Sequence, residues 1–176
     1  MARHFVGPRP AAPPATRIVP GPGQESVWDF PRPPRVDPST EHVVIRFGGQ
    51  VVADSRDAVR VLETSHPPGY YLPRAAFATG VLVESAASSV CEFKGTGRYL
   101  DLITSDAVAR RAAWYYPEPR PGYEALRDMV AVYPAAMESC EVNGEQVIPQ
   151  EGGFYGGWIT SRVVGPFKGG PGTIGW

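Results

Sequence analysis

Residues 42–54 are His-Val-Val-Ile-Arg-Phe-Gly-Gly-Gln-Val-Val-Ala-Asp, and they contain a clear signal for antiparallel strands. Two short runs rich in Val and Ile, residues 42–47 and 50–54, flank the pair Gly48-Gly49. A two-residue glycine connection is typical of a tight hairpin, because glycine adopts the positive φ angles that such turns require. The stretch therefore predicts two paired strands.

The rest of the middle of the chain has the same character. Turn signals occur at Gly95-Thr96-Gly97 and at Asn143-Gly144-Glu145, and each is flanked by short runs of strand-forming residues. Further strand candidates lie at residues 58–63, 81–84, 89–94, 98–104, 107–116, 137–142 and 146–148. Many short strands joined by tight turns predict a mostly β (α+β) fold, in which short antiparallel strands form a small curled sheet or a barrel.

One helix is predicted over residues 123–132. Tyr123, Leu126, Val130 and Tyr133 recur at helical spacing, and two prolines precede them. We expect this helix to lie against the sheet and to pack its apolar stripe into the core.

The two ends of the chain differ from the middle. Residues 1–23 hold six Pro and three Gly, so we expect a mobile Pro-rich arm over residues 1–25 and a single β-rich domain over residues 26–148. Residues 149–176 hold nine Gly but also several aromatic residues, and disordered tails are poor in aromatics. We expect this tail to be ordered and to pack on the domain or on a partner subunit, which would make the protein a homo-oligomer.

Composition argues against several classes of function. The chain of 176 residues has 17 basic and 18 acidic side chains, which argues against a general partner of nucleic acids or anionic membranes. No apolar run is long enough to span a membrane, and residues 1–23 lack the apolar core of a secretory signal. Cys91 and Cys140 are too few for a disulfide scaffold, so we expect reduced thiols and a cytoplasmic protein.

Several blocks of sequence, in matching order, resemble the bacterial domain-of-unknown-function 427 family. The similarity extends from about Ser26 to Trp176. The blocks are Ser26-Val27-Trp28-Asp29-Phe30-Pro31-Arg32-Pro33-Pro34, Val52-Ala53-Asp54-Ser55, Leu62-Glu63-Thr64-Ser65-His66-Pro67-Pro68, Tyr70-Tyr71-Leu72-Pro73, Cys91-Glu92-Phe93-Lys94-Gly95 with Tyr99, Ala113-Trp114-Tyr115-Tyr116-Pro117 and Gly152-Gly153-Phe154-Tyr155-Gly156-Gly157-Trp158-Ile159-Thr160. Phe93 departs from the family, which usually has Trp or Tyr there, so a polar role for that ring is in doubt.

The resemblance implies no defined reaction, although the family has been labelled as nucleotidyltransferase-type. Metal-dependent nucleotidyl transfer needs carboxylates that hold Mg²⁺ and a backbone cradle for phosphates. The sequence has no Asp-x-Asp pair and no phosphate-binding loop, and the glycines at residues 169–172 are not followed by a helix signal. Nucleotidyl transfer is therefore the less favoured function.

Glu63 and His66 are the first candidates for catalysis. They lie three residues apart, where a predicted strand enters a Pro-rich loop. A carboxylate beside an imidazole forms a usable acid–base pair, because histidine titrates near neutral pH. The structural alternative is that both side chains satisfy amides of the loop backbone.

Lys94 and Cys91 are the second candidates. Lys94 precedes the predicted glycine turn and would hold an anionic group, or else form an ordinary ion pair. Cys91 is a candidate nucleophile, or else a small buried residue. Strand alternation predicts that these two side chains point to opposite faces unless a bulge intervenes.

Aromatic residues are the candidates for ligand binding, since aromatic walls with a few polar groups form small-molecule pockets. They are equally suited to a small core. The candidates are Tyr70, Tyr71, Tyr99, Trp114, Tyr116 and Trp158. We expect no cofactor and no metal, because two distant cysteines and few histidines make a poor set of zinc ligands.

The sequence thus favours a cytoplasmic enzyme that acts on a small molecule by acid–base chemistry in an aromatic-walled pocket. A non-catalytic module that binds a small ligand or a protein is the alternative. An enzyme should bring Glu63, His66 and Lys94 to one concave site, whereas a binding module should leave them apart and expose an apolar patch.

Overall fold

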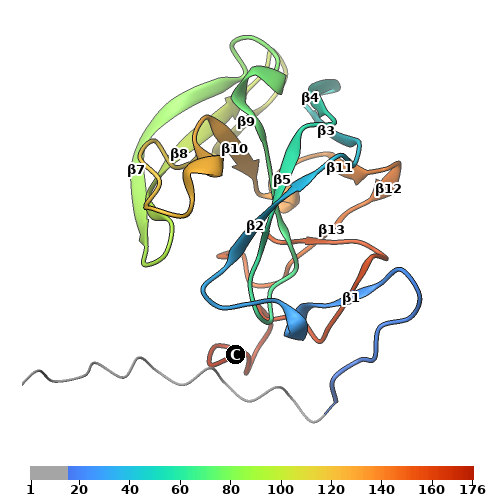
Figure 1. Ribbon diagram of the computed structural model, residues 1–176. Coiled ribbons are helices and arrows are strands. Elements are labelled where there is room, and N and C mark those ends of the chain that lie inside the picture. Colours follow the sequence, from blue (N-terminus) through green and yellow to red (C-terminus); the bar gives the residue numbers. More distant parts are fainter. Residues whose placement is uncertain (1–15) are drawn as a thin grey trace, which may run out of the picture.

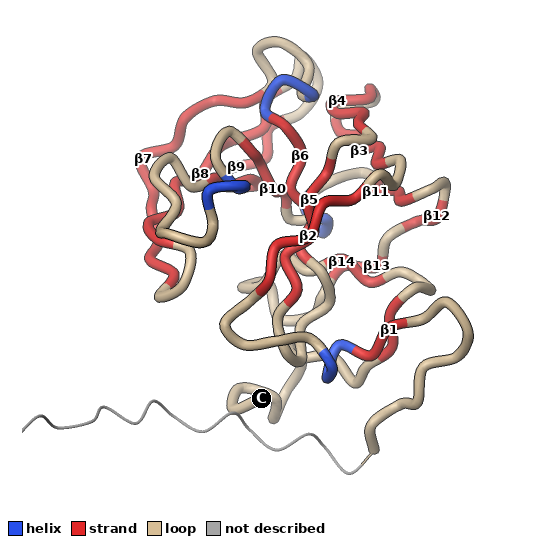
Figure 2. Tube along the Cα trace, in the orientation of Figure 1, coloured by secondary structure: helices blue, strands red, loops and turns tan. Residues whose placement is uncertain are grey.

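The computed structural model describes residues 16–176, and it consists of strands joined by turns and loops (Figures 1 and 2). Of the mobile arm predicted over residues 1–25, residues 1–15 lie outside the described part of the chain. No helical segment within residues 16–176 has the length and apolar character needed to cross a membrane.

The larger sheet has seven antiparallel strands. Their spatial order is β2 (Arg35–Ser39), β5 (Ala58–Leu62), β6 (Gly69–Pro73), β10 (Met129–Val132), β9 (Val108–Tyr115), β8 (Gly95–Ile103) and β7 (Leu82–Cys91). Strands β2 and β7 are its two edges, and no pairing within residues 16–176 joins them. The prediction of a mostly β fold of antiparallel strands is confirmed, and the sheet is not closed into a barrel.

The second sheet has four strands and contains the hairpin predicted from residues 42–54. Its spatial order is β12 (Glu145–Gln146), β11 (Ser139–Val142), β3 (Val43–Phe47) and β4 (Gln50–Ser55). Gly48 and Gly49 form the β3–β4 turn with φ angles of 59° and 75°. Asn143 and Gly144 form the β11–β12 turn, also with positive φ angles, as the Asn-Gly signal predicted. Figure 1 shows this sheet on one side of β2 and β5 and the β7–β8 hairpin on the other.

Two small ladders involve the C-terminal part of the chain, and the first of them joins it to the start of the described residues. Strand β1 (Glu25–Ser26) pairs in parallel with β15 (Val163–Val164), and β13 (Ile148–Pro149) pairs with β14 (Trp158–Ile159). Trp28 donates its indole N–H to the carbonyl oxygen of Pro166 at 2.9 Å. The segment 149–176 therefore packs against its own chain, and its exchange between two subunits stays a prediction.

The central strands of the larger sheet are buried on both faces, whereas the edge strand β7 is largely exposed. Its inner face packs on the four-stranded sheet and forms the main core, which includes Ile45, Leu72, Leu102 and Cys140. Its outer face is covered by the segment that follows β9, through Tyr123 and Leu126. Alternation along a strand then sends neighbouring side chains into different cores: Tyr70 and Leu72 face the main core, and Tyr71 faces the outer one.

The prediction of a helix over residues 123–132 is wrong. The chain forms one 3-10 turn, leaves it at Asp128 with φ 59°, and enters β10. Because the sheet is covered on both faces, Leu126 packs in the outer core and Val130 in the main one, so the apparent helical stripe divides between two cores. The helical segments of the described chain are 3-10 turns: η1 (Val27–Asp29), η2 (Arg74–Ala76), η3 (Glu124–Leu126) and η4 (Pro134–Ala136).

The turn predicted at Gly95-Thr96-Gly97 is also misplaced. The chain reverses over residues 92–94, and Cys91 pairs with Gly95. Gly95 has φ 110°, and a Cβ there would lie 3.3 Å from the carbonyl oxygen of Glu118. These glycines allow the segment after β9 to approach the sheet closely, and they do not form the turn.

The main core makes a test of this arrangement possible. Leu72 is fully buried between the two sheets, so Leu72→Ala should lower the free energy of unfolding by about 2–5 kcal/mol. Val90→Ala is the matched control, because Val90 is 74% exposed and should change stability by less than about 0.5 kcal/mol. Urea unfolding followed by tryptophan fluorescence measures both. Equal effects of the two substitutions would contradict the placement of β6.

Candidate functional site

Three aromatic side chains form the centre of the outer face of the larger sheet, and we call Tyr71, Trp114 and Tyr116 the outer aromatic face. Trp114 donates its indole N–H to the hydroxyl of Tyr71 at 3.0 Å. The ring of Tyr71 lies edge-on to that of Trp114 and stacks on that of Tyr116, with centroids 6.0 and 6.5 Å apart. Burial raises the pKa of both tyrosines, so their hydroxyls stay protonated at neutral pH.

Cys91 and Lys94 lie together beside this face, because the chain turns between them. The backbone N–H of Lys94 points at the Sγ atom of Cys91 at 3.5 Å, and the ammonium group lies 6.0 Å from the centre of the Tyr116 ring. Strand alternation predicted opposite faces, and this is wrong, since residues 92–94 form the turn. Burial acts to lower the pKa of Lys94, but Tyr71, Cys91 and Glu63 raise it above its usual value, so the side chain is a cation.

His66 is held in one tautomer by Gln150. The side-chain oxygen of Gln150 accepts the backbone N–H of Gly157 at 3.0 Å, and its nitrogen donates to the carbonyl oxygen of Lys168 at 2.7 Å. These two contacts fix the orientation of the amide, so the nitrogen that lies 3.2 Å from Nδ1 of His66 is a donor. The neutral imidazole therefore carries its proton on Nε2 and offers it as a hydrogen-bond donor.

The surroundings of His66 keep it uncharged. Burial, followed by the charges of Lys168, Arg32 and Lys94, lowers the pKa of His66 to about 3. Tyr155 packs edge-on against the imidazole with ring centroids 4.6 Å apart. The chain has only two lysines, and both act on this histidine. We call Arg32, Lys94 and Lys168 the cation cluster.

Glu63 belongs to the same neighbourhood but bonds to a different partner. Its carboxylate lies 3.2 Å from Nε of Arg32, whose terminal nitrogen donates to the carbonyl oxygen of Thr64 at 2.8 Å. No hydrogen bond or ion pair within residues 16–176 joins the side chains of Glu63 and His66. None joins Cys91 to His66 in that part of the chain either, so the imidazole is not placed to activate the thiol.

The other predicted aromatic residues divide between two places. Tyr70 and Trp158 stack on each other in the main core with centroids 5.1 Å apart, away from the outer aromatic face. Tyr99 on β8 pairs with Trp114 on the neighbouring strand β9, and its side chain faces that of Tyr133. Cys140 lies in the main core, and burial raises the pKa of its thiol to about 12.

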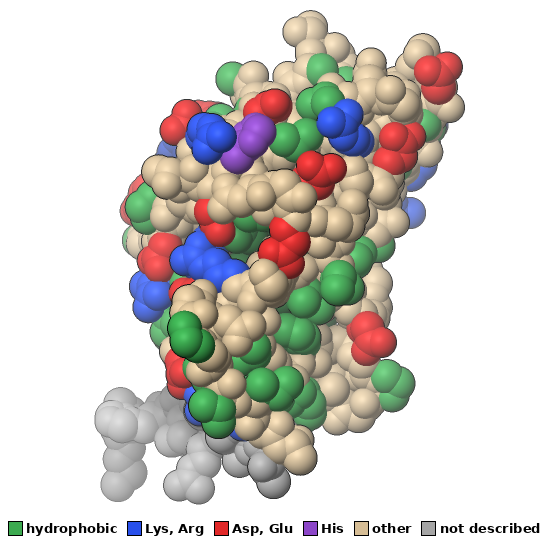
Figure 3. All heavy atoms as spheres, turned by 90° about the vertical axis from the view of Figure 1, so that its right-hand side faces the viewer, with side chains coloured by type: hydrophobic (Ala, Val, Ile, Leu, Met, Phe, Trp, Pro, Cys, Tyr) green, Lys and Arg blue, Asp and Glu red, His purple; other side chains and the backbone are tan. Residues whose placement is uncertain are grey.

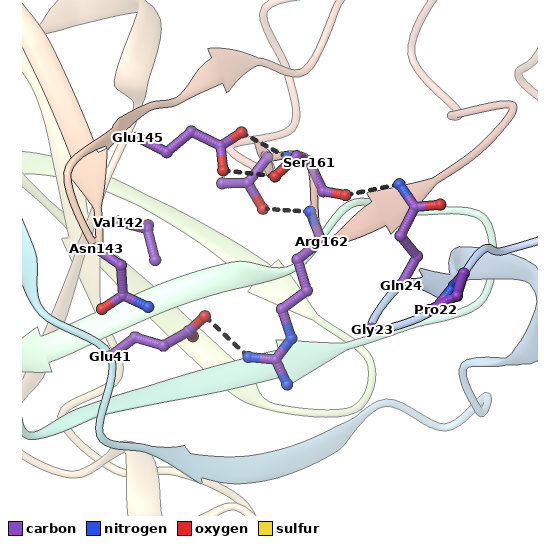
Figure 4. A pocket seen from close by; sticks show the side chains of 10 residues that line it. Pro22, Gly23, Gln24, Glu41, Val142, Asn143, Glu145, Ser161 and Arg162 are labelled. Carbon is purple, nitrogen blue, oxygen red and sulfur yellow. Dashed lines mark hydrogen bonds and ion pairs between the residues drawn. The ribbon is translucent and has the colours of Figure 1, made fainter.

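A polar pocket of about 460 Å³ on another side of the molecule is the competing site (Figure 4). There the guanidinium group of Arg162 lies 2.8 Å from the carboxylate of Glu41. The carboxylate of Glu145 accepts hydrogen bonds from the backbone N–H and from the hydroxyl of Ser161. Figure 3 shows the face that lies on the right-hand side of Figure 1. Acidic and basic side chains lie beside one another on this face, with no dominant sign of charge. The charged groups of this pocket already have partners within the chain, and these contacts join the tail to the four-stranded sheet and to Glu41.

Several residues of the candidate site could not be recognised as such in the sequence. Lys168 offered a weak signal, as the only lysine besides Lys94, and Arg32 lies in one of the blocks shared with the family. Tyr155 also lies in one of those blocks, whereas Gln150 gave no signal, because the fold of the tail brings it to His66. Residues 16–176 contain no group of three or more His, Cys, Asp and Glu side chains placed to hold a metal ion.

The comparison with known families agrees with the resemblance of the sequence blocks. The family described as "Domain of unknown function (DUF427)" matches residues 35–143, and the chain belongs to this family. The matched region includes Glu63, His66 and Lys94, whereas Gln150, Tyr155 and Lys168 lie beyond it. A search of curated proteins finds no match.

The neutral state of His66 predicts a specific dependence of stability on pH. The pKa of His66 is about 3 in the folded protein, against about 6.5 in an unfolded chain. The unfolded state therefore binds the additional proton as the pH falls below about 6.5, and His66 should lower stability by up to about 1.4 kcal/mol per pH unit between those two values.

Urea unfolding of the native protein and of His66→Gln, between about pH 5 and pH 7, measures this contribution as the difference between two curves. The native protein should lose stability more steeply than the variant as the pH falls. Parallel curves would show that His66 is not buried as described.

Packing of the tail on the outer aromatic face makes a second prediction. A Cβ atom on Gly156 would lie 2.3 Å from the ring of Trp114, which the Tyr71 hydroxyl holds in place. Gly156→Ala should therefore displace residues 154–157 and change the near-ultraviolet circular dichroism of the aromatic residues. Gly175→Ala, with nothing within 4 Å of the added Cβ, is the control. An unchanged spectrum for Gly156→Ala would be inconsistent with the described contact.

Proposed function

We propose that this protein is a cytoplasmic enzyme that binds a small anionic molecule beside the outer aromatic face and acts on it by acid–base chemistry. The observation that supports the proposal most directly is the gathering of Arg32, Lys94 and Lys168 around a neutral histidine. Glu63 is the one acidic side chain of the described chain that acts on this cluster: it pairs with Arg32 and also raises the pKa of Lys94. Excess positive charge in a partly buried site is stabilised by an anionic ligand.

Each group has a role that follows from its surroundings. The ammonium group of Lys94 holds the anionic group of the ligand, and the Nε2 proton of His66 offers a further hydrogen bond. A bound anion opposes the electrostatic effect of the cation cluster and so raises the pKa of His66. The imidazole then takes up a proton at Nδ1, which requires the Gln150 amide that donates to this nitrogen to turn away. The imidazolium acts as a general acid through Nε2, while Glu63 is the candidate base.

A ligand-binding module without turnover is the second candidate. Glu63 and His66 each bind their own partner and not one another, an arrangement that suits recognition as well as catalysis. In that case the same cations hold the ligand, and no group changes its protonation during a reaction.

Calorimetric titration with a panel of small carboxylates, sugar phosphates and nucleotides tests the binding step. Lys94→Met keeps the apolar stem but removes the charge, so it should weaken binding of a responding anion about 10- to 100-fold, as expected for a hydrogen bond to a charged group. Arg98→Met is the matched control, because Arg98 is an exposed cation on the neighbouring strand and should stay within about twofold. Equal losses in both variants would reject the site.

Incubation of the responding anion with the protein separates the two candidates. Product that appears with native protein and disappears in Glu63→Gln and His66→Gln, with binding retained, supports the enzyme. Binding without product, unchanged in Glu63→Gln, supports the module. Absence of binding by every anion would overturn both.

A further inference from the structure

A groove with a volume of about 620 Å³ lies between the tail and the end of the larger sheet, beside the candidate site. Four aromatic side chains line it: Tyr99 from β8, Tyr133 after β10, and Phe154 and Tyr155 from the segment between β13 and β14. Its volume lies within the range of sites that hold small organic molecules. Neither Lys94 nor Glu63 lines the groove.

The charge of the groove is positive. Arg110 and Arg111 are its only charged lining residues within the described chain. The nearby carboxylate of Asp101 is occupied: one oxygen accepts from the Arg110 side chain at 2.7 Å, and the other accepts the backbone N–H of Arg111 at 2.7 Å. Within residues 16–176 no acidic side chain bonds the guanidinium group of Arg111, which leaves its donors available to a ligand.

The position of Arg111 is fixed by an irregularity of the sheet. The β8–β9 register shifts between Leu100 and Leu102. Arg111 has a φ angle of 49°, a backbone conformation that is rare for residues other than glycine and asparagine. The buried carboxylate of Asp101 holds this bulge by its bond to the Arg111 backbone. Bulges are frequent beside binding sites, where they redirect a side chain.

Phe154 completes the groove on the side of the tail. Its ring is 73% exposed and lies edge-on to Tyr155 with centroids 4.9 Å apart. It follows Gly152 and Gly153, whose φ angles of 96° and 67° suit glycine and strain any other residue. The backbone thus adopts a demanding turn and presents an apolar ring to solvent at the mouth of the groove.

We infer that this groove binds a planar aromatic anion, with its ring against Phe154 and Tyr133 and its phosphate or carboxylate at Arg111. The inference goes beyond the proposed function and does not depend on it, because Glu63, His66 and Lys94 do not line the groove. Gln150 does line it and also bonds to His66. Tyr155 lies between them, since it packs against His66 and also lines the groove.

Phenyl phosphate is the probe, and two-dimensional ¹H–¹⁵N NMR of the full chain is the measurement. The amide signals of Ala87, Ala136 and Phe154 should shift on titration. Inorganic phosphate, which lacks the ring, and benzyl alcohol, which lacks the charge, should each bind at least tenfold more weakly.

Substitutions at two residues, Arg111 and Phe154, localise the contacts. Arg111→Gly removes the guanidinium group and accepts the positive φ, so it should weaken binding at least tenfold, and Arg111→Asn is the second variant if the first fails to fold. Phe154→Ala should weaken binding about threefold or more, because stacking energy is lost. Arg98→Met should stay within twofold.

Shifts confined to the surroundings of Cys91 and Lys94, lost in Lys94→Met but not in Arg111→Gly, would overturn this inference while supporting the proposed function. Equal binding of inorganic phosphate would overturn the aromatic part of it. Unchanged signals at Ala87, Ala136 and Phe154 would overturn it entirely and would leave the proposed function untouched.

Discussion

Burial of the central strands of the larger sheet on both faces is the constraint on which the rest of the molecule depends. One face packs on the four-stranded sheet, and the other is covered by the chain after β9. Neighbouring side chains of β6 and β10 therefore enter two separate cores. Alternation along β6 places Tyr70 in the main core and Tyr71 beside Lys94. The outer aromatic face therefore forms on the side of the larger sheet that does not pack on the four-stranded sheet.

The same constraint explains how much of the fold the sequence predicts. Strands with one apolar run and a glycine turn, such as β3 and β4, are predicted well, because their signals are local. Strand β10 is missed, because a strand buried on both faces shows no polar alternation and can imitate a helix. Strand β2 is missed because it contains Pro38, which is tolerated only because β2 is an edge.

The candidate site shows a similar division. Glu63, His66 and Lys94 lie in short blocks of charged residues beside prolines and glycines, and the structure brings them within electrostatic range of one another. Gln150 has no such local signal, because it becomes informative only when Gly157 and Lys168 orient its amide toward His66. The tautomer of His66 is thus set by the tail, which no pattern around His66 itself can predict.

Comparison of the two groups of charged side chains explains why one fits a structural role and the other a ligand. In the first group, Glu25 forms ion pairs with buried Arg60 and with Arg162. Arg162 also pairs with Glu41, so each cation of this group has a carboxylate partner. Around His66, Arg32 pairs with Glu63, and Lys168 donates to the main-chain oxygen of Trp176 at 2.8 Å. Within residues 16–176 no acidic side chain forms an ion pair with Lys94 or Lys168. An unbalanced cluster in a partly buried place opposes folding unless another interaction compensates it. An anion is the simplest compensation, and it would act on the same histidine that the cations now keep neutral.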